Sequence, residues 1–434
     1  MSLSDEDIDD SFSTARVTGR SDDITLSAES YREFLYDAAD PLLADARGLN
    51  YDEFAAEKKK SPFLRELLEY WNGLYREPFV GMTTDGHVKA GNYALPAHLE
   101  PNSEAMVTAA YRVLSTLSDD ERRAFQYSLD APEWRAWSNP EFVIHRVGLR
   151  LEELTEGAVS AFFDLMRESL SPAGYDRVVD AMELNGFLGE LTGLPCILNS
   201  RSYWVSLYGN PSTSEPWGWQ LFGHHVALNV VMVGGRQVIA PVFLGAEPAS
   251  SEGSRPTLFE TRERLALELG SSFTAEQRVK AIVYGSVLDP TMPEGRLHPA
   301  DERHVAGAFR DNRVVPYEGI NARELGDAQR RTLVEIVEDV LLLLPETERR
   351  RTMREVGACV GETWISWYGA TDGSQPFYLR IQSPVIMTEM DHHAGVWLNN
   401  RLPERFHVHT TFRLPNGNDY ARAYIGEWRA RTGV

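Results

Sequence analysis

Two stretches decide the fold: residues 203–235, YWVSLYGNPSTSEPWGWQLFGHHVALNVVMVGG, and residues 363–395, TWISWYGATDGSQPFYLRIQSPVIMTEMDHHAG. They align without a gap at an offset of 160 residues, and seven of the 33 aligned positions are identical. Unrelated stretches of average composition are expected to share roughly two. We therefore interpret the two stretches as copies of one structural unit.

Both copies have the composition of β-strands. YWVSLYG and TWISWYG are rich in β-branched and aromatic residues, and turn residues follow them. Residues 224–233 are predicted as one strand whose side chains alternate between two faces. Gly234-Gly235 then marks a hairpin into QVIAPVFLG. These patterns predict antiparallel β-ribbons.

Helical patterns flank the ribbons. Ser61-Pro62 followed by FLRELLEYWNGLY predicts a helix with proline in its first turn, and residues 103–117 predict another. Because segments upstream of the two copies also resemble each other, we predict an α+β fold with an internal duplication. In this fold, antiparallel ribbons and sheets pack with helices, and a pseudo-two-fold axis relates the halves.

The predicted division of the chain follows from this duplication. We expect a flexible acidic tail (1–24), an N-terminal helical and strand extension (25–112), repeat one (113–250) and repeat two with the H-x-H strand (251–434).

Charge and composition narrow the class of protein. The 434 residues carry 43 Lys and Arg against 64 Asp and Glu, a net charge of −21, so we expect neither a nucleic-acid nor a membrane partner. Two cysteines, Cys196 and Cys359, are too few for a disulfide framework. The first ten residues, MSLSDEDIDD, lack the features of a secretory signal, so we expect a cytoplasmic location.

Histidines are concentrated in the ribbons. Strand alternation would place His224 on an apolar face with Val226 and Leu228, and His225 on the opposite face with Asn229. His225 is therefore the better candidate ligand. His224 stays in the candidate set, although a hydrogen-bonded histidine in the core suits it better.

The second copy adds further donors. Glu389 occupies the position of Asn229, and a carboxylate inside a strand needs a partner, because burying it unpaired is costly. His407 and His409 share one face of a later strand, about 6–7 Å apart along it. Together, His225, Glu389, His407 and His409 offer three imidazoles and a carboxylate, and they form a predicted metal site for one divalent transition metal, Fe, Cu, Zn or Mn. Hydrogen bonds between histidine and glutamate across strands are the alternative.

Other polar residues are weaker candidates. Glu247, at the end of the first ribbon, and Arg413, after the H-x-H motif, are candidates for catalysis or substrate contact, although turn chemistry explains them equally well. Asp391-His392-His393 is placed at a hairpin tip, where a solvated turn is the usual outcome; its role is left open.

Several motifs occur in an order that resembles a known family. WGWQLFGHHVALN, FLGAEP, an isolated strand glutamate, H-x-H-T-x-x-R-x-P and N-D-Y are similar to those of the family catalogued as domain of unknown function 3500. PFVGMTTDG and LSPAGYDRVVDAMELNGFL extend the resemblance over most of the chain from about Pro62. The resemblance supports the architecture and the choice of His225, Glu389, His407 and His409, and implies no particular reaction.

These observations predict a metal-dependent enzyme. It would have one mononuclear His/Glu site and act on a small organic substrate. Oxidative chemistry is favoured slightly, because no separate general base stands out and because nearby aromatic residues suit an apolar pocket: Trp217, Trp219, Phe222 and Trp397. The alternatives are a metal-dependent hydrolase with Glu389 as the base, or a non-catalytic small-molecule binding protein. The oligomeric state is left open.

Overall fold

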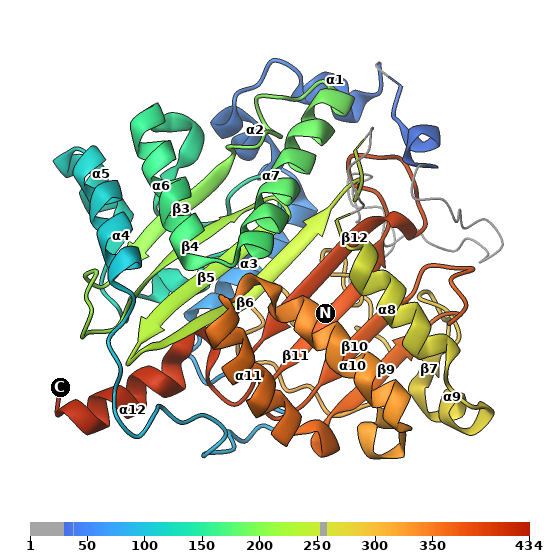
Figure 1. Ribbon diagram of the computed structural model, residues 1–434. Helices are drawn as coiled ribbons and strands as arrows, with labels where there is room; N and C mark the ends of the chain where they lie inside the picture. The colour runs from blue at the N-terminus through green and yellow to red at the C-terminus, as the bar shows by residue number, and fades with distance from the viewer. Residues whose placement is uncertain (1–29, 38, 252–257) are drawn as a thin grey trace.

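A single β-sheet runs through the molecule. The computed structural model describes residues 30–37, 39–251 and 258–434. Within them the strands pair in the order β1-β3-β4-β5-β6-β12-β11-β10-β9-β7, with β2 beside β3 and β8 beside β9. β1 and β7 pair in parallel with β3 and β9, whereas the central pairings from β3 to β9 are antiparallel. The result is a mixed α/β fold with a large open mixed sheet (Figure 1).

The strands of the described residues have the following bounds: β1 (Gln126–Tyr127), β2 (Leu149–Arg150), β3 (Tyr203–Tyr208), β4 (Trp217–Gly223), β5 (Val226–Val233), β6 (Arg236–Ala246), β7 (Ile282–Tyr284), β8 (Ile320–Asn321), β9 (Trp364–Tyr368), β10 (Tyr378–Gln382), β11 (Met387–His393) and β12 (Glu404–Arg413).

The α-helices have the following bounds: α1 (Pro41–Ala46), α2 (Tyr51–Lys58), α3 (Pro62–Arg76), α4 (Glu104–Thr116), α5 (Asp119–Phe125), α6 (Glu156–Ser169), α7 (Pro172–Thr192), α8 (Glu260–Ser271), α9 (Ala275–Ala281), α10 (Asp327–Val340), α11 (Glu346–Ala358) and α12 (Arg422–Thr432). Short 3₁₀ helices are η3 (Ser30–Phe34), η4 (Pro132–Arg135), η5 (Leu151–Glu153), η6 (Ala322–Glu324), η7 (Leu341–Leu343), η8 (Val360–Glu362) and η9 (Asp419–Ala421).

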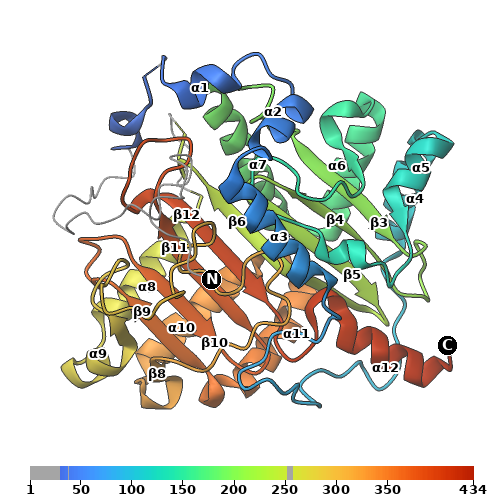
Figure 2. The ribbon, with the colours of Figure 1, turned by 180° about the vertical axis from the view of Figure 1, so that it is seen from behind.

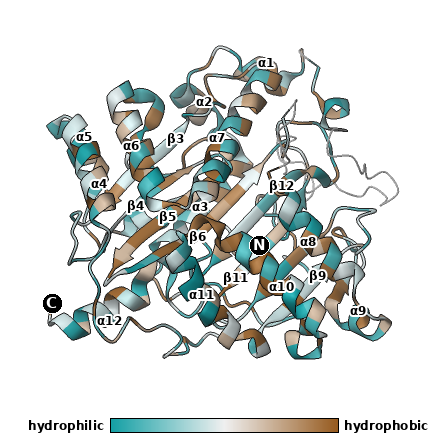
Figure 3. Ribbon diagram, viewed as in Figure 1, coloured by the Kyte–Doolittle hydropathy of each residue, from teal (hydrophilic) through white to brown (hydrophobic). Residues whose placement is uncertain are grey.

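The two faces of the sheet are covered differently. Helices α6, α7, α8, α10 and α11 lie across the face seen in Figure 1, whereas α3 and long loops lie across the opposite face, seen in Figure 2. On the helix side, Leu207, Trp219 and Val230 are opposite one another on β3, β4 and β5 and are fully buried. Figure 3 shows β5 and β6 as mostly hydrophobic and α11 as mostly hydrophilic. Burial of this apolar face is the main stabilising contribution to the fold.

The face under the loops is polar, although it is buried. Ser206, Gln220 and Asn229 are opposite one another on β3, β4 and β5 and are fully buried. The Gln220 amide donates to Asn229 Oδ1 (2.6 Å) and to the carbonyl of Trp134 (2.8 Å), which belongs to a covering segment. Because buried polar groups are costly without partners, the loops on this side act as hydrogen-bonding partners of the sheet.

Several predicted elements are confirmed. The helix predicted to begin at Ser61-Pro62 is α3, which buries Phe63, Leu64, Leu67 and Trp71. The helix predicted over 103–117 is α4. The hairpin predicted at Gly234-Gly235 joins β5 to β6.

Two local predictions are wrong. His224-His225 form the two-residue turn between β4 and β5, and His225 adopts a positive φ of 64°, so residues 224–233 are not one strand. Asp391-His392-His393 is not a solvated hairpin tip. These residues end β11, and all three are buried. Hydrogen bonding to neighbouring strands, which the local pattern does not show, decides both cases.

The structure describes only part of what the predicted division of the chain concerns. The predicted tail, 1–24, lies outside the described residues, and the predicted boundary at 112 falls inside α4. Among the described residues, none of the helices is long and apolar enough to cross a membrane. The cytoplasmic location stays a prediction.

Candidate metal centre

Two groups of buried donors lie side by side on the polar face of the sheet. β11 and β12 are neighbours, and Asp391 is paired with His409 across them. The first group, which we name the three-histidine group, consists of His225, His407 and His409. The second, the His-Asp-His group, consists of His304, Asp391 and His393. In each group the possible ligand atoms lie within 4.8 Å of one another.

The three-histidine group is assembled by a turn and a strand. His407 and His409 are two residues apart on β12, so they share a face. His407 Nε2 lies 3.0 Å from His409 Nε2. His225 reaches them from the turn before β5, and its ring centroid lies 5.0 Å from that of His409. Gly245 makes this approach possible, because a Cβ there would lie 2.8 Å from His409 Cδ2 and 3.1 Å from His225 Cδ2.

These three imidazoles are held in the neutral form, which is the form that binds metals. Burial lowers the pKa of His407 to about 4. Burial, together with neighbouring histidines, lowers the pKa values of His225 and His409 well below the usual value. His407 Nδ1 lies 2.7 Å from the carbonyl oxygen of Ala394, so Nδ1 donates and Nε2 is the available lone pair.

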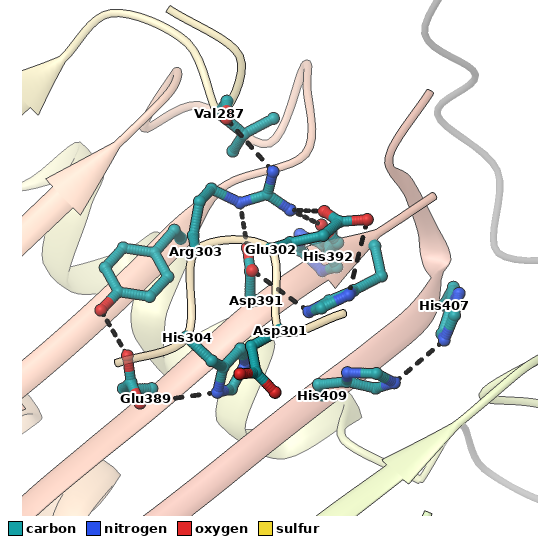
Figure 4. Close-up of polar contacts among 12 residues, drawn as sticks. Val287, Asp301, Glu302, Arg303, His304, Glu389, Asp391, His392, His407 and His409 are labelled. Carbon is teal, nitrogen blue, oxygen red and sulfur yellow. Dashed lines mark hydrogen bonds and ion pairs between the residues drawn. The ribbon is translucent and has the colours of Figure 1, made fainter. Parts of the chain in front are cut away.

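The His-Asp-His group combines β11 with a loop. Asp391 and His393 lie on β11, and His304 comes from the long loop between β7 and β8. Figure 4 shows His304 and Asp391 near Glu389 and next to His409. The ring centroids of His393 and His409 are 3.8 Å apart, so the two groups adjoin each other.

Glu389 lies next to these groups, and neither group includes it. Its two oxygens accept hydrogen bonds from the backbone N–H groups of Val305 and Ala306 (both 2.8 Å) and from the hydroxyls of Tyr378 (2.6 Å) and Thr411 (2.9 Å). Burial alone would raise the pKa of the Glu389 carboxyl, but nearby His304 and these hydrogen bonds hold it below its usual value. The carboxylate therefore anchors the covering loop on β11.

Glu247 supports a second covering loop. Its carboxylate accepts hydrogen bonds from the backbone N–H groups of Val396 (2.9 Å), Trp397 (3.1 Å) and Leu398 (3.0 Å). Burial raises its pKa to about 7 despite these bonds. Glu247 Oε1 lies 3.9 Å from His407 Nδ1, close to the metal centre but outside both groups.

Arg413 also lies outside both groups. It is fully buried and forms ion pairs with Asp311 (2.6 Å) and Asp419 (3.0 Å). Its guanidinium also donates to the carbonyl oxygens of Ala306 (3.0 Å) and Gly307 (2.5 Å). Its contacts tie the loop that bears His304 to β12.

His224 and His392, the chain neighbours of two candidate ligands, have partners of their own. His224 Nδ1 lies 2.8 Å from Asn185 Oδ1, and its ring stacks on that of His225 at 3.8 Å. His392 Nδ1 accepts from the backbone N–H of Phe377 (3.0 Å), on the opposite face of β11 from His393.

A pocket opens onto the three-histidine group. Its polar walls are formed by the three histidines themselves, by His224 and His393, and by the carboxylates of Glu141, Asp301 and Glu302. Its apolar walls include Trp71, Ile144 and Phe309. The four aromatic residues expected around the site, Trp217, Trp219, Phe222 and Trp397, do not line this pocket, because the sheet directs Trp219 towards α6 and a loop–helix layer provides the walls.

The sequence reasoning missed the His-Asp-His group as a unit. The sequence pattern predicts a solvated turn at Asp391 and His393, and no motif singles out His304. His304 lies in residues 285–319, where no periodic pattern assigns a face. The signal that could have found the group is strand alternation continued from Glu389 through Asp391 to His393.

Comparison with known proteins identifies the family of the chain. The family model described as a protein of unknown function (DUF3500) matches residues 100–422. No curated protein and no solved structure matches the chain. All residues of both donor groups fall inside the matched range.

Proposed function

This chain belongs to the DUF3500 family of proteins of unknown function, and we propose that it is a metal-dependent enzyme acting on a small organic molecule. The observation that carries the proposal is the three-histidine group: three buried imidazoles whose ligand nitrogens lie within 4.8 Å of one another beside a pocket. The proposed ion is one divalent transition metal, Fe, Cu, Zn or Mn, for which imidazole is a suitable ligand.

The surroundings support a metal with open coordination positions. Three neutral imidazoles leave such an ion with its full positive charge and with room for water or substrate. The pocket supplies that room, and its walls are partly apolar through Trp71 and Phe309. Such a lining suits a small organic substrate more than a highly charged one.

We favour oxidative chemistry. An iron or copper ion on three histidines could supply O₂ chemistry, for which the partly apolar walls of the pocket are suited. A hydrolase is the second candidate, because the carboxylates of Glu302 and Asp301 also line the pocket, where one of them could act as a base towards a metal-bound water.

Metal analysis tests the proposal. The purified chain should retain metal at the three-histidine group, and His407→Ala should remove it, because Nε2 of His407 is one of the three donors. The matched control is His392→Ala, a buried histidine on the opposite side of β11, which should keep the metal. Background metal content after reconstitution with Fe, Cu, Zn and Mn would contradict the proposal.

Two probes separate the candidate reactions. The Fe²⁺-loaded chain exposed to nitric oxide should give the electron paramagnetic resonance signal of an iron–nitrosyl, and His407→Ala should lose the part of this signal that comes from the three-histidine group. The hydrolase alternative predicts instead that the Zn²⁺-loaded chain cleaves p-nitrophenyl acetate and that the same variant does not.

We also propose that the two halves of the sheet are products of an internal duplication related by a pseudo-two-fold axis. The strand order supports it, because β1-β3-β4-β5-β6 and β7-β9-β10-β11-β12 occur in mirrored order from the two ends of the sheet. Gly148 and Gly319 support it as well, because each has a positive φ beside the equivalent strand. The three-histidine group would then draw His225 from one half and the H-x-H motif from the other.

A further inference from the structure

We propose that the His-Asp-His group binds a second divalent transition-metal ion, so that the site is dinuclear. This inference rests on the proposed function in one respect, because it places the second ion beside the one assigned to the three-histidine group. It differs from the single site expected from the sequence.

Buried polar atoms without a hydrogen bond carry the inference. His304 Nε2, Asp391 Oδ2 and His393 Nε2 are buried and have no hydrogen-bond partner among the described residues. The three side chains are nearly inaccessible, with exposed fractions of 2%, 0% and 3%. An unsatisfied buried polar group is costly, and three that converge within 4.8 Å are rare in native structures. A cation bound between them would give all three atoms a partner.

The other nitrogen of each histidine is directed towards a carboxylate. His304 Nδ1 lies 3.5 Å from Glu389 Oε2, and His393 Nδ1 lies 3.6 Å from Glu302 Oε1; both are electrostatic contacts, and His304 Nδ1 makes no hydrogen bond within the described part of the chain. Metal-bound histidines usually face a carboxylate or carbonyl through their second nitrogen, which fixes the ring and its tautomer. In both residues the Nε2 atom is therefore left for the ion.

The carboxylate of Asp391 is also oriented by a neighbouring charged side chain. Its Oδ1 accepts a hydrogen bond from Arg303 Nε (2.7 Å), and Arg303 also pairs with Glu302. This bond occupies one carboxylate oxygen and leaves Oδ2, which lies 3.2 Å from His393 Nε2 without a hydrogen bond to it. Figure 4 shows the guanidinium of Arg303 between Asp391 and Glu302.

The donor set indicates the kind of ion. Two imidazoles and one carboxylate suit Zn²⁺, Mn²⁺ or Fe²⁺ and are a poor set for Ca²⁺, which prefers six or more oxygens. The pocket reaches His393 but not His304 or Asp391, so this ion would lie deeper than the first. The contact between the His393 and His409 rings places the two sites next to each other.

Equilibrium dialysis of the metal-free full-length chain against Zn²⁺ tests the proposal. We expect two equivalents of bound Zn²⁺ in the wild type, one in His304→Gln and one in His225→Gln. His392→Gln is the matched control and should keep two. Circular dichroism verifies that each variant is folded, and His393→Gln replaces His304→Gln if the latter is not.

The possible outcomes are distinguishable. One equivalent that depends on His225 but not on His304 would overturn the second site and leave the proposed function standing. One equivalent lost in both variants would mean a single shared ion and would also overturn it. One equivalent that depends on His304 alone would support the His-Asp-His group and contradict the three-histidine group. No bound Zn²⁺ at all would contradict both.

Discussion

At the scale of the residue, His224 and His225 differ although they are adjacent and stacked. We predict that His225→Ala abolishes metal binding at the three-histidine group, because its ring faces the H-x-H motif. His224→Ala should keep the metal and cost about 1–3 kcal/mol of stability, because it removes a buried hydrogen bond to Asn185. Metal stoichiometry and thermal midpoint of both variants check this. Loss of metal only in His224→Ala would mean that the assignment is reversed.

The second prediction concerns the pH dependence of the stability of the protein and rests on His298. Burial lowers its pKa to about 4, despite nearby Asp301, whereas an unfolded histidine titrates near 6.5. Between these values the unfolded chain binds a proton that the native chain does not, so stability falls as the pH drops from 6.5 towards 4. From pH 7 to pH 5 this contribution is at most about 2 kcal/mol.

The comparison with His298→Asn isolates this contribution. Asparagine offers an acceptor for the backbone N–H groups of Ala300 and Asp301, which donate to His298 Nδ1, but does not titrate. Urea unfolding at pH 7 and pH 5 should therefore show a smaller decrease in stability for the variant than for the wild type. An equal decrease in both would show that His298 does not contribute.

The position of a residue could be predicted from the sequence where its own strand determines it. It could not be predicted where distant segments determine it. His407 and His409 could be predicted because alternation within one strand puts them on one face. Strand alternation favours His225 over His224 as a ligand, but this reason does not hold, because a turn and not a strand directs the His225 side chain. Glu389 was expected to need a partner, but the partners are backbone and hydroxyl groups that no local pattern could identify.

At the scale of the element, Gly148 and Gly319 allow two connections to pass close to the sheet. Each has a positive φ, 83° and 88°, and a Cβ would lie 2.0 Å from the carbonyl oxygen of Val205 or Ile365. Gly148→Ala and Gly319→Ala should each destabilise the protein by about 3 kcal/mol or more, through backbone strain and a clash that the sheet cannot relieve.

Gly91→Ala is the matched control for these glycines. Gly91 has a similar φ of 84°, but nothing lies within 4 Å of a Cβ there. It should cost only about 1–2 kcal/mol, the strain of the left-handed conformation alone. Chemical denaturation of the three variants measures the difference. Equal losses in all three would show that the close approach to the strands is unimportant.

Elements with periodic patterns could be predicted, and those without could not. α3 and the β5–β6 hairpin were expected from an apolar helical face and a Gly-Gly turn. Residues 285–319 have no such pattern, yet they carry His304 and cover the polar face of the sheet. Their conformation depends on distant partners, such as Asp311 with Arg413, so it follows from tertiary contacts alone.

At the scale of the whole molecule, the two halves of the sheet, strands β1–β6 and strands β7–β12, are joined through the β6–β12 pairing. A buried hydrophobic core also extends across them. We therefore predict a single cooperative unfolding transition, in which calorimetric and van't Hoff enthalpies agree. Bound metal should shift the whole transition to higher temperature, because the ligands come from both halves. Two resolved transitions, or a shift of only part of one, would contradict this prediction.

The two ends of the sheet have a consequence for behaviour at high concentration. β3 and β9 would each be an open edge, ready to pair with another chain. Instead β2 and β1 cover successive parts of β3, and β8 and β7 do the same for β9. These four strands are only two or three residues long. Each outer rim thus presents too few free N–H and C=O groups to template aggregation, and the sheet is protected from growing into fibrils.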